Sequence, residues 1–380
     1  MRGLTISAHG GLDRLELRDD LAVPSLVSDT QVRVRVLAAA LNHLDLFVVG
    51  GLPNVHIVPP WIVGSDAMGT IDEIGAAVSG LAVGDRVLVN PGISDRICEY
   101  CLAGEQPLCP RFGVLGEHVP GTIAEQIVLP AANVRRIAPD ADPVVAAAFT
   151  LSTLTAWRML VSRARVQAGE HVLLWGIGGG VAQACLQIAK LAGAYVTVTS
   201  GSDAKLERAI ALGADATVNH LGIDVGKEMR ARTAKRGVDV VVDSVGEATW
   251  AQSLGALGRR GRLVTCGGTS GPMVTTDVRR LFWNQWSILG STMGNDAEFD
   301  AVVEHFRAGR LMPVIDRVYA LDDSRGAFER MASGEQFGKL VVRIDACAAS
   351  TRSTSRRSSR RSATRWRWAR SPSVRGTARS

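Results

Sequence analysis

The chain has 380 residues and a formal net charge of +6. Ten arginines and no acidic residue lie within residues 346–380. Residues 1–345 therefore have 33 basic and 37 acidic residues, a net charge of −4. The basic balance of the whole chain therefore does not indicate a nucleic-acid-binding fold. With 46% hydrophobic and 21% charged residues the composition is that of a globular protein, and about 345 residues are too many for one typical core, so we expect two domains.

The first region of the chain consists of short β-rich runs separated by Gly, Pro and Asn. Gln31–Leu41 and Asp85–Gly92 are examples of these runs. Short β-branched segments bounded by turn residues predict an antiparallel or barrel-like β-domain, which we assign to residues 1–150.

The middle region, residues 151–293, alternates predicted strands with predicted helices such as Val181–Ala192 and Asp203–Leu212. Several of its strands are continuous β-branched runs, as expected for parallel strands buried on both faces. Six strands with helical crossovers predict a doubly wound α/β sheet. The predicted strands are His171–Gly176, Tyr195–Ser200, Ala216–His220, Asp239–Gly246, Arg262–Gly268 and Ser287–Met293.

A glycine-rich turn links the first of these strands to the helix that follows it. Its glycines, which let a backbone turn tightly and approach a pyrophosphate, are Gly176, Gly178, Gly179 and Gly180. The N-terminus of the next helix offers free N–H groups to the same phosphates. Gly-rich turns often bind no ligand, but the strand, turn and helix together with five further strands predict a dinucleotide site.

The choice between NAD and NADP depends on the end of the second strand, where NAD sites place an acidic residue. Here that position falls near Ser200, followed by Gly201, Ser202 and, further on, Lys205. Hydroxyls, backbone N–H groups and Lys205 could hold a 2′-phosphate, so we expect NADP(H) in preference to NAD(H). The alternatives are that Ser202 only caps the next helix and that Lys205 is a solvated charge.

Three cysteines are closely spaced in a loop bounded by Gly and Pro, and an aspartate precedes them. The four residues are Asp95, Cys98, Cys101 and Cys109. Three thiols and one carboxylate suit a closed tetrahedral site, which predicts one structural Zn²⁺. Glu99 or water could replace Asp95 as the fourth ligand, and three unliganded thiols are the alternative to a metal site.

Motifs along residues 1–345 resemble those of the zinc-binding dehydrogenases of the medium-chain dehydrogenase/reductase superfamily. The resemblance implies a GroES-like β-rich catalytic domain, a Rossmann domain with a six-stranded parallel sheet, and a homo-oligomer, a dimer or tetramer, paired through the sheet edge at Ser287–Met293. The motifs that carry it are Asn42–Asp45, Gly64–Ile71, Val83–Val87, the cysteine loop, Gly121–Pro130, Leu154–Trp157, the glycine turn and Phe337–Val341.

Two departures from the family pattern matter for the chemistry. The first cysteine of the four-cysteine loop is replaced by Asp95. At the places of the catalytic zinc ligands, the chain has Asn42, Ser65 followed by Asp66, and Leu151. Asn, Ser and Leu do not form a competent zinc site, so we expect no catalytic zinc.

A chain without that Lewis acid is similar to the zinc-independent quinone oxidoreductases and enoyl reductases of the superfamily. We therefore expect an enzyme that transfers hydride between NADP(H) and a small quinone, enone or carbonyl substrate. Asn42 is the expected hydrogen-bond donor to the substrate oxygen, and His43 is the candidate proton donor or else a histidine at a strand edge. Asp45 and Asp66 are expected to orient these neighbours.

Further cofactor contacts are implied by the resemblance. Thr155 and Trp157 are expected to line the nicotinamide pocket, although Trp157 could instead belong to the core. The cofactor set is completed by Val181, Gly267 and Lys339. Two alternatives to this function remain at this point: a zinc-containing alcohol dehydrogenase, and a non-catalytic nucleotide- or nucleic-acid-binding protein with the same fold.

The last part of the chain divides into two pieces. Residues 294–345 contain a predicted helix, Ala297–Ala308, and a predicted strand, Lys339–Ile344, which we expect to pack back onto the first domain. Residues 346–380 are rich in Arg and Ser and are expected to be disordered. This tail could bind nucleic acid, act as an assembly or regulatory arm, or be an out-of-frame extension, which is the interpretation we favour.

The sequence also indicates a compartment. No apolar run reaches the roughly 18–20 residues that a membrane span needs, and the N-terminus lacks the apolar stretch of a secretory signal. Six cysteines in 380 residues are too few for a secreted disulfide framework. We therefore expect a cytoplasmic protein that acts on a small molecule and has no membrane partner.

Overall fold

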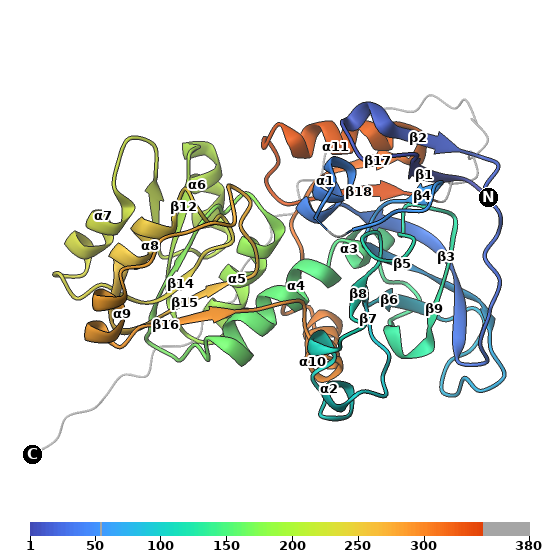
Figure 1. Cartoon of the computed structure of the whole chain (residues 1–380), viewed down its shortest axis with the longest axis horizontal. Helices are drawn as coiled ribbons and strands as arrows, with labels where there is room; N and C mark the ends of the chain where they lie inside the picture. The colour runs from blue at the N-terminus through green and yellow to red at the C-terminus, as the bar shows by residue number, and fades with distance from the viewer. Residues whose placement is uncertain (54, 345–380) are drawn as a thin grey trace, which may run out of the picture. The chain divides into compact units, whose positions relative to one another are not determined.

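The computed structural model describes residues 1–53 and 55–344 (Figure 1). The predicted disordered tail, and with it any contact to nucleic acid, lies outside the described residues. Within them, no helix is long and apolar enough to cross a membrane.

The N-terminal region forms a β-rich domain, as the sequence predicts. Its largest sheet has seven strands in the order β10-β6-β5-β3-β18-β17, and β9 pairs with β3. These strands are β3 (Gln31–Ala40), β5 (Asp66–Ile74), β6 (Arg86–Val89), β9 (Gln126–Pro130), β10 (Val134–Arg136), β17 (Ile315–Ala320) and β18 (Lys339–Arg343). Smaller sheets are formed by β1 (Gly3–Ile6), β2 (Leu15–Arg18) and β4 (Trp61–Ile62), and by β7 (Gly92–Ile93) and β8 (Gly113–Val114).

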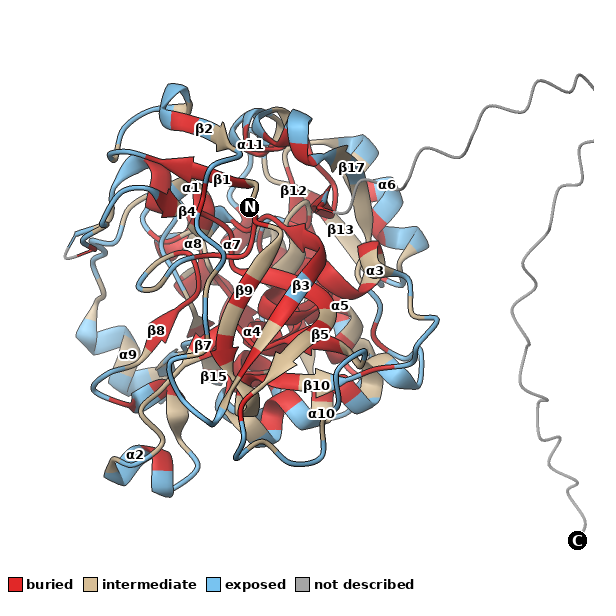
Figure 2. Ribbon diagram, turned by 90° about the vertical axis from the view of Figure 1, so that its right-hand side faces the viewer, coloured by how far each residue is buried: buried red, intermediate tan, exposed pale blue. Residues whose placement is uncertain are grey.

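Strand β3 is the centre of this domain. Val32, Val34 and Val36 are completely buried on one face, whereas Arg33 and Arg35 on the other face are less buried (Figure 2). This alternation is the pattern of a strand with one face on the core. Towards its end, β3 is buried on both sides, where it runs between β5 and β18.

The second sheet is parallel and has six strands in the order β13-β12-β11-β14-β15-β16. In chain order this is 3-2-1-4-5-6, the arrangement of dinucleotide-binding doubly wound sheets, so the predicted fold is confirmed. The strands are β11 (His171–Leu174), β12 (Tyr195–Ser200), β13 (Ala216–Asn219), β14 (Val238–Val242), β15 (Leu257–Thr265) and β16 (Ser287–Gly290). The helices between them are α5 (Gly180–Leu191), α6 (Asp203–Ala211), α7 (Val225–Arg232), α8 (Trp250–Ala256) and α9 (Val278–Asn284) (Figure 1).

The remaining helices accompany the β-rich domain and the link to the parallel sheet. They are α1 (His43–Gly50), α2 (Glu99–Leu102), α3 (Pro143–Ala147), α4 (Thr150–Trp157), α10 (Asp296–Arg307) and α11 (Ser324–Ala332). A π-helical turn, Arg158–Arg163, continues α4.

Several predicted boundaries are wrong. The predicted strand Asp239–Gly246 ends at Val242, because Asp243 turns back to accept hydrogen bonds from the backbone N–H groups of Val245 and Gly246. The strand expected from Arg262 begins at Leu257, since its first residues pair with Val238. Strand β17 and helix α11 were not predicted at all. The final strand, β18, pairs antiparallel with β3, as expected for a segment that returns to the first domain.

Candidate functional site

Four polar side chains converge in the interior where β3 ends. Ala40 of β3 pairs with Asp66 of β5 on one side and with Val341 of β18 on the other, so the first residues of both neighbouring strands lie beside the continuing chain at Asn42. Asn42 precedes helix α1, which also carries Asp45. We call Asn42, Asp45, Asp66 and Lys339 the central cluster.

The members of the central cluster are bonded to one another and shielded from water. Lys339 Nζ donates to Asn42 Oδ1 at 2.6 Å and to Asp66 Oδ2 at 3.0 Å, and Asn42 Nδ2 donates to Asp66 Oδ2 at 3.0 Å. The other oxygen of Asp66 accepts from the backbone N–H of Leu151 at 2.7 Å. Because Asp66 is 0% and Lys339 3% exposed, this ion pair is a buried one whose partners depend on each other.

Asp45 fixes the position of Asn42 through the backbone. Its Oδ2 accepts from the Asn42 N–H at 2.7 Å, which completes a capping box at the start of α1, and its Oδ1 accepts from Ser65 Oγ at 3.3 Å. Burial raises the pKa of Asp45 to about 7, although these hydrogen bonds and the charge of Lys339 oppose the shift. The prediction that Asp45 and Asp66 orient their neighbours agrees with these contacts.

His43 is the first residue of α1 and is solvent-exposed. The protein atoms around its ring displace water and lower its pKa, and the positive charge of Lys339 lowers the pKa further. Near neutral pH the imidazole is therefore uncharged, so it can donate an N–H or accept a proton without carrying a permanent charge.

The glycine turn has the predicted position between β11 and α5. Gly176 has a φ of +69°, which favours glycine, and Gly179 is the residue before the first turn of α5. A Cβ on Gly180 would lie 2.9 Å from Lys339 Cδ, and one on Gly178 would lie 3.1 Å from the carbonyl oxygen of Gln336. Glycine at these two positions therefore also allows close contact with the chain near β18.

The end of β12 has the uncharged character that the sequence indicates. Ser200 Oγ accepts from the Ser202 backbone N–H at 3.1 Å. Ser202 is the N-cap residue of α6, as one predicted alternative has it, but its side chain makes no capping hydrogen bond. Asp203 Oδ1 accepts from Asn219 Nδ2 at 2.7 Å, which ties this carboxylate to the end of β13.

Lys205 lies beside the glycine turn. Its Nζ donates to the carbonyl oxygen of Gly334 at 2.6 Å and lies 3.2 Å from the position that a Cβ on Gly178 would take. Its amine is thus placed near the pyrophosphate-binding turn. The expected role in holding a 2′-phosphate stays a prediction.

Sequence reasoning missed His220, which follows β13 at the same edge of the sheet. Its Nε2 would lie 3.2 Å from a Cβ on Gly201, and its ring lies 5.9 Å from the Trp175 ring between centroids, tilted by 38°. Its Nδ1 is buried and has no hydrogen-bond partner among the described residues. The signal that could have found it is its place directly after the third strand, next to the edge formed by Ser200.

The other expected cofactor residues have mixed surroundings. Thr155 is buried in α4, and its Oγ1 lies 3.7 Å from Met293 Sδ. Trp157 is only partly buried, and its ring lies 5.0 Å from that of His305, tilted by 48°, so it packs against helix α10. Val181 is in the first turn of α5, and Gly267 follows β15.

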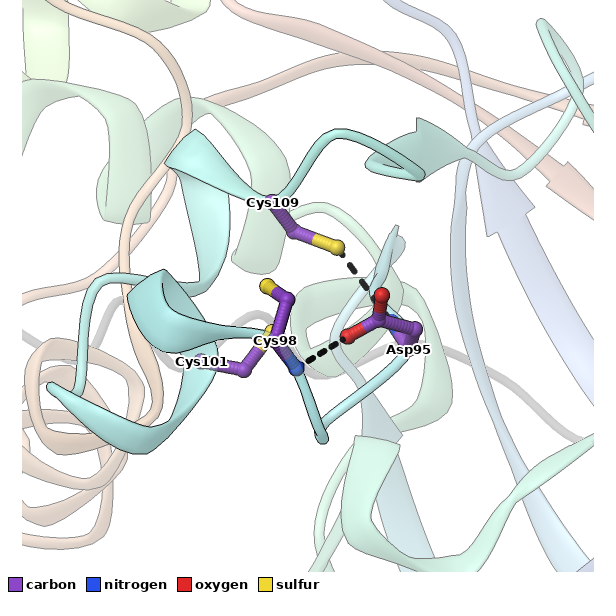
Figure 3. Close-up of side chains that lie close together, drawn as sticks. All are labelled: Asp95, Cys98, Cys101 and Cys109. Carbon is purple, nitrogen blue, oxygen red and sulfur yellow. Dashed lines mark hydrogen bonds between the residues drawn. The ribbon is translucent and has the colours of Figure 1, made fainter.

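The four predicted metal ligands come together in one lobe of the structure (Figure 3). Their ligand atoms, the three Sγ atoms and a carboxylate oxygen of Asp95, all lie within 4.8 Å of one another. Tetrahedral zinc with Zn–S bonds of about 2.3 Å needs ligand atoms roughly 3.5–4 Å apart, so small movements would close this site. We call Asp95, Cys98, Cys101 and Cys109 the cysteine lobe.

Backbone hydrogen bonds hold the carboxylate of Asp95 in place and keep it ionised. Its Oδ1 accepts from the N–H groups of Cys98 and Ile97, both at 3.0 Å, and these bonds hold its pKa well below the ordinary value. The carboxylate is therefore ionised, as a ligand must be. Glu99, the alternative ligand, is not among the residues whose ligand atoms gather there.

The cysteine lobe is attached to the rest of the protein by ion pairs. Arg96 Nη1 lies 2.6 Å from Asp296 Oδ2 of α10. Arg158, which follows α4, is paired with Glu105 of the lobe and, at 3.0 Å, with Glu298 of α10.

Comparisons with known proteins agree with this architecture. The alcohol dehydrogenase GroES-like domain matches residues 28–139, and the zinc-binding dehydrogenase domain matches residues 180–308. An NAD-dependent alcohol dehydrogenase of Sulfolobus acidocaldarius is 30% identical over 90% of this chain and 100% of its own length. The human quinone oxidoreductase is 27% identical over 90% of this chain and 97% of its own. A crystal structure of an NAD-dependent alcohol dehydrogenase matches with a TM-score of 0.87 and 41% identity, covering 91% of this chain and 100% of that one.

A doubly wound sheet with a glycine turn, joined to a GroES-like domain, defines a nicotinamide-dependent oxidoreductase. The chain belongs to the zinc-binding dehydrogenases of the medium-chain dehydrogenase/reductase superfamily. It is accordingly an NAD(P)-dependent enzyme, and the alternative of a non-catalytic binding protein is set aside.

Proposed function

We propose that the protein transfers hydride between NADP(H) and a small quinone, enone or other conjugated carbonyl substrate, with zinc in the cysteine lobe and none at the reacting centre. The observation that carries the proposal is the bonding of the central cluster. Asn42 and Asp66, which lie at or next to the places of the family's zinc ligands, are bonded to the ammonium of Lys339, and an ammonium cannot ligate a metal. In residues 1–53 and 55–344, the cysteine lobe is the one group of three or more His, Cys, Asp or Glu residues gathered closely enough for a metal.

The residues of the site suit such an acceptor. When bound, the reduced nicotinamide supplies a hydride to an electrophilic atom of the conjugated system. The substrate oxygen then gains negative charge and needs a hydrogen-bond donor, for which Asn42 Nδ2 is available, and afterwards the product needs a proton. His43 is adjacent in the chain and open to solvent, so its neutral imidazole would first take a proton from solvent and then pass it to the product.

The cofactor would be held at the edge of the parallel sheet. The glycine turn and the first N–H groups of α5 would take the pyrophosphate, with Lys205 and Lys339 close by. Thr155, Val181 and Gly267 would surround the nicotinamide. The uncommitted Ser202 hydroxyl and the absence of an acidic residue at Ser200 favour NADP over NAD.

The second candidate function is a zinc-containing alcohol dehydrogenase with NAD. It is favoured by the names of the Sulfolobus acidocaldarius relative and of the matching crystal structure. The two candidates differ in acceptor, in cofactor and in metal content.

A panel of substrates with both cofactors separates them. We expect NADPH oxidation with quinones or enones and a lower Kd for NADPH than for NADH, measured by quenching of protein fluorescence. Oxidation of simple alcohols with NAD⁺ as the fastest reaction, together with two zinc ions per chain, would establish the second candidate instead.

We also propose that the protein forms a dimer or tetramer through the edge of the parallel sheet. Strand β16 is the edge strand, and most of its residues are exposed. Phe282 and Trp283 of the adjacent helix α9 are 63% and 74% exposed, which leaves apolar surface beside an unpaired strand. Light scattering of Ile288→Lys should then show a smaller particle than the wild-type protein, and an unchanged mass would contradict this interface.

A further inference from the structure

We propose that Lys339 replaces the electrostatic role of a metal by acting through Asn42: its ammonium orients and polarises the Asn42 amide, which then donates its free N–H to the substrate oxygen. Lys339 is thus a positioning residue for the reaction, beyond any contact that it makes with the cofactor. This inference rests on the proposed function, because it concerns the group that meets the developing negative charge.

The orientation of the Asn42 amide follows from the charges around it. An ammonium can only donate hydrogen bonds, and a carboxylate can only accept them. Lys339 Nζ lies 2.6 Å from one end of the amide, and Asp66 Oδ2 lies 3.0 Å from the other. A reversed amide would place its NH₂ group against the ammonium and its oxygen against the carboxylate. The ion pair therefore holds the amide nitrogen on the side of Asp66.

The proton count leaves one donor for a ligand. The Asn42 Nδ2 group has two protons, and one of them is directed to Asp66 Oδ2. The second takes part in no hydrogen bond among the residues described. Asn42 is 8% exposed, more than Lys339, Asp45 or Asp66, so it is the residue of the cluster with the most remaining access to a ligand.

The cluster is also rigid. The Asn42 backbone N–H is bound by Asp45, and the second oxygen of Asp66 is bound by the Leu151 N–H, so neither the amide nor the carboxylate can swing away without breaking a hydrogen bond. The stem of Lys339 passes Gly180, where a Cβ would lie 2.9 Å from Cδ. A donor fixed in this way costs no reorganisation when charge develops on the substrate.

The ammonium of Lys339 acts on the substrate oxygen by polarising the Asn42 amide that lies between them. A hydrogen bond from a cation to an amide oxygen withdraws electron density from the nitrogen and makes the remaining N–H a stronger donor, and a low local dielectric enhances this. The charge of Lys339 is thereby transmitted to the substrate oxygen. Direct contact of Lys339 with the substrate is not required.

A double-mutant cycle tests this transmission. The variants are Asn42→Ala, a neutral replacement of the ion pair (Lys339→Met with Asp66→Asn), and their combination. The neutral replacement avoids a buried unpaired carboxylate and keeps an acceptor for the Leu151 N–H, so it should fold even where Lys339→Met alone does not. Single-turnover hydride transfer and the Kd for NADPH are measured for each, and Lys190→Met, which removes a surface lysine paired with Asp215, is the control.

We expect the neutral replacement to slow hydride transfer about 10- to 100-fold when Asn42 is present, the size of one hydrogen bond to a charged group. In the Asn42→Ala background the same replacement should cost less than about 3-fold, and any change that it makes in the Kd for NADPH should be the same in both backgrounds. Equal effects in both backgrounds, or a loss that appears only as weaker NADPH binding, would overturn the role of Lys339. If none of the quinones and enones tested supports NADPH oxidation by the wild-type protein, the proposed function itself would be overturned.

Discussion

The cysteine lobe and the central cluster are two groups of potential metal ligands whose nearest charges differ. In the lobe, three thiols and a carboxylate face one another, and the nearest cation, Arg111, lies 4.0 Å from Asp95 with its side chain 76% exposed. In the central cluster, Lys339 is bonded directly to the oxygens that a metal would need. The ammonium of Lys339 balances the negative charge of the central cluster, whereas a zinc ion from solution would balance that of the cysteine lobe.

The surroundings of the two groups agree with the proposal that only the cysteine lobe binds a metal. The loop that carries the cysteine lobe contains short elements, α2 and a 3₁₀ turn at Gln106–Leu108. The central cluster lies where β3, β5 and β18 meet, and the sheet holds its members without further help. Metal binding in the lobe is therefore expected to supply folding energy, whereas the central cluster is expected to supply chemistry.

The largest effect should follow from breaking the lobe. Cys101→Ser removes a buried thiolate ligand, so zinc content should fall to a trace and the free energy of unfolding should fall by more than about 3 kcal/mol, because zinc-binding energy is folding energy here. Metal analysis and thermal unfolding measure the two changes. Glu99→Gln is the matched control in the same loop and should keep its zinc. Loss of zinc from the control would identify Glu99 as a ligand.

The next effect concerns the central cluster, and it should change rate rather than stability. Asn42→Ala should lower kcat about 10²- to 10³-fold, the usual cost of removing one donor to a developing oxyanion. Zinc content should stay the same, in contrast to Cys101→Ser. A normal kcat for Asn42→Ala would show that another group meets the substrate oxygen.

The raised pKa of Asp45 predicts that the stability of the central cluster depends on pH, on the order of a few kcal/mol. Its folded-state pKa of about 7 lies above the ordinary value near 4, so the stability that Asp45 contributes is full below about pH 4 and is lost as the pH rises to about 7. Asp45→Asn keeps an acceptor for the Asn42 N–H and removes the buried charge. The free energy of unfolding of Asp45→Asn minus that of the wild-type protein should therefore increase between pH 5 and pH 8, by on the order of 2 kcal/mol.

Denaturant unfolding of both proteins at the two pH values measures this difference. A difference that is independent of pH would mean that Asp45 ionises normally in the folded protein. The cysteine lobe is the same in both proteins, so its own pH dependence cancels in this difference.

The smallest effect concerns cofactor choice, away from both groups. Ser200→Asp places a carboxylate at the end of β12, where it would repel a 2′-phosphate and could bind ribose hydroxyls. The ratio of the Kd for NADPH to that for NADH should rise about tenfold, which corresponds to about 1.4 kcal/mol. Equilibrium fluorescence titration measures both constants, and an unchanged ratio would show that the 2′-phosphate does not lie near Ser200.

Local patterns were enough to predict much of the fold. The strand, glycine turn and helix at β11 and α5 could be placed to within two residues, because their signal is contained in about 20 consecutive residues. The four residues of the cysteine lobe are likewise close in sequence, and the structure brings them together as predicted. Strand β17 was missed because its residues are exposed or only partly buried, so its hydrophobic pattern is weak. Its pairing with β18 depends on the tertiary structure and leaves no local signal.

The central cluster shows where sequence reasoning ends. Asn42 and Asp66 could be singled out from motif positions, but Lys339 is 297 residues from Asn42 and 273 from Asp66, and no spacing rule connects them. We expected Lys339 to contact the cofactor and did not foresee its bonds to these two residues. Only the pairing of β18 with β3 brings the ammonium to this place.

The most direct test of the account is the zinc content of the wild-type protein measured together with the turnover of Cys101→Ser. We predict one zinc ion per chain in the wild-type protein, and NADPH oxidation by the folded, zinc-depleted variant at a rate within about threefold of wild type, because the reacting centre uses Asn42 and Lys339. Two zinc ions per chain, or a zinc-depleted variant whose turnover returns only when zinc is added at constant folded fraction, would contradict the account.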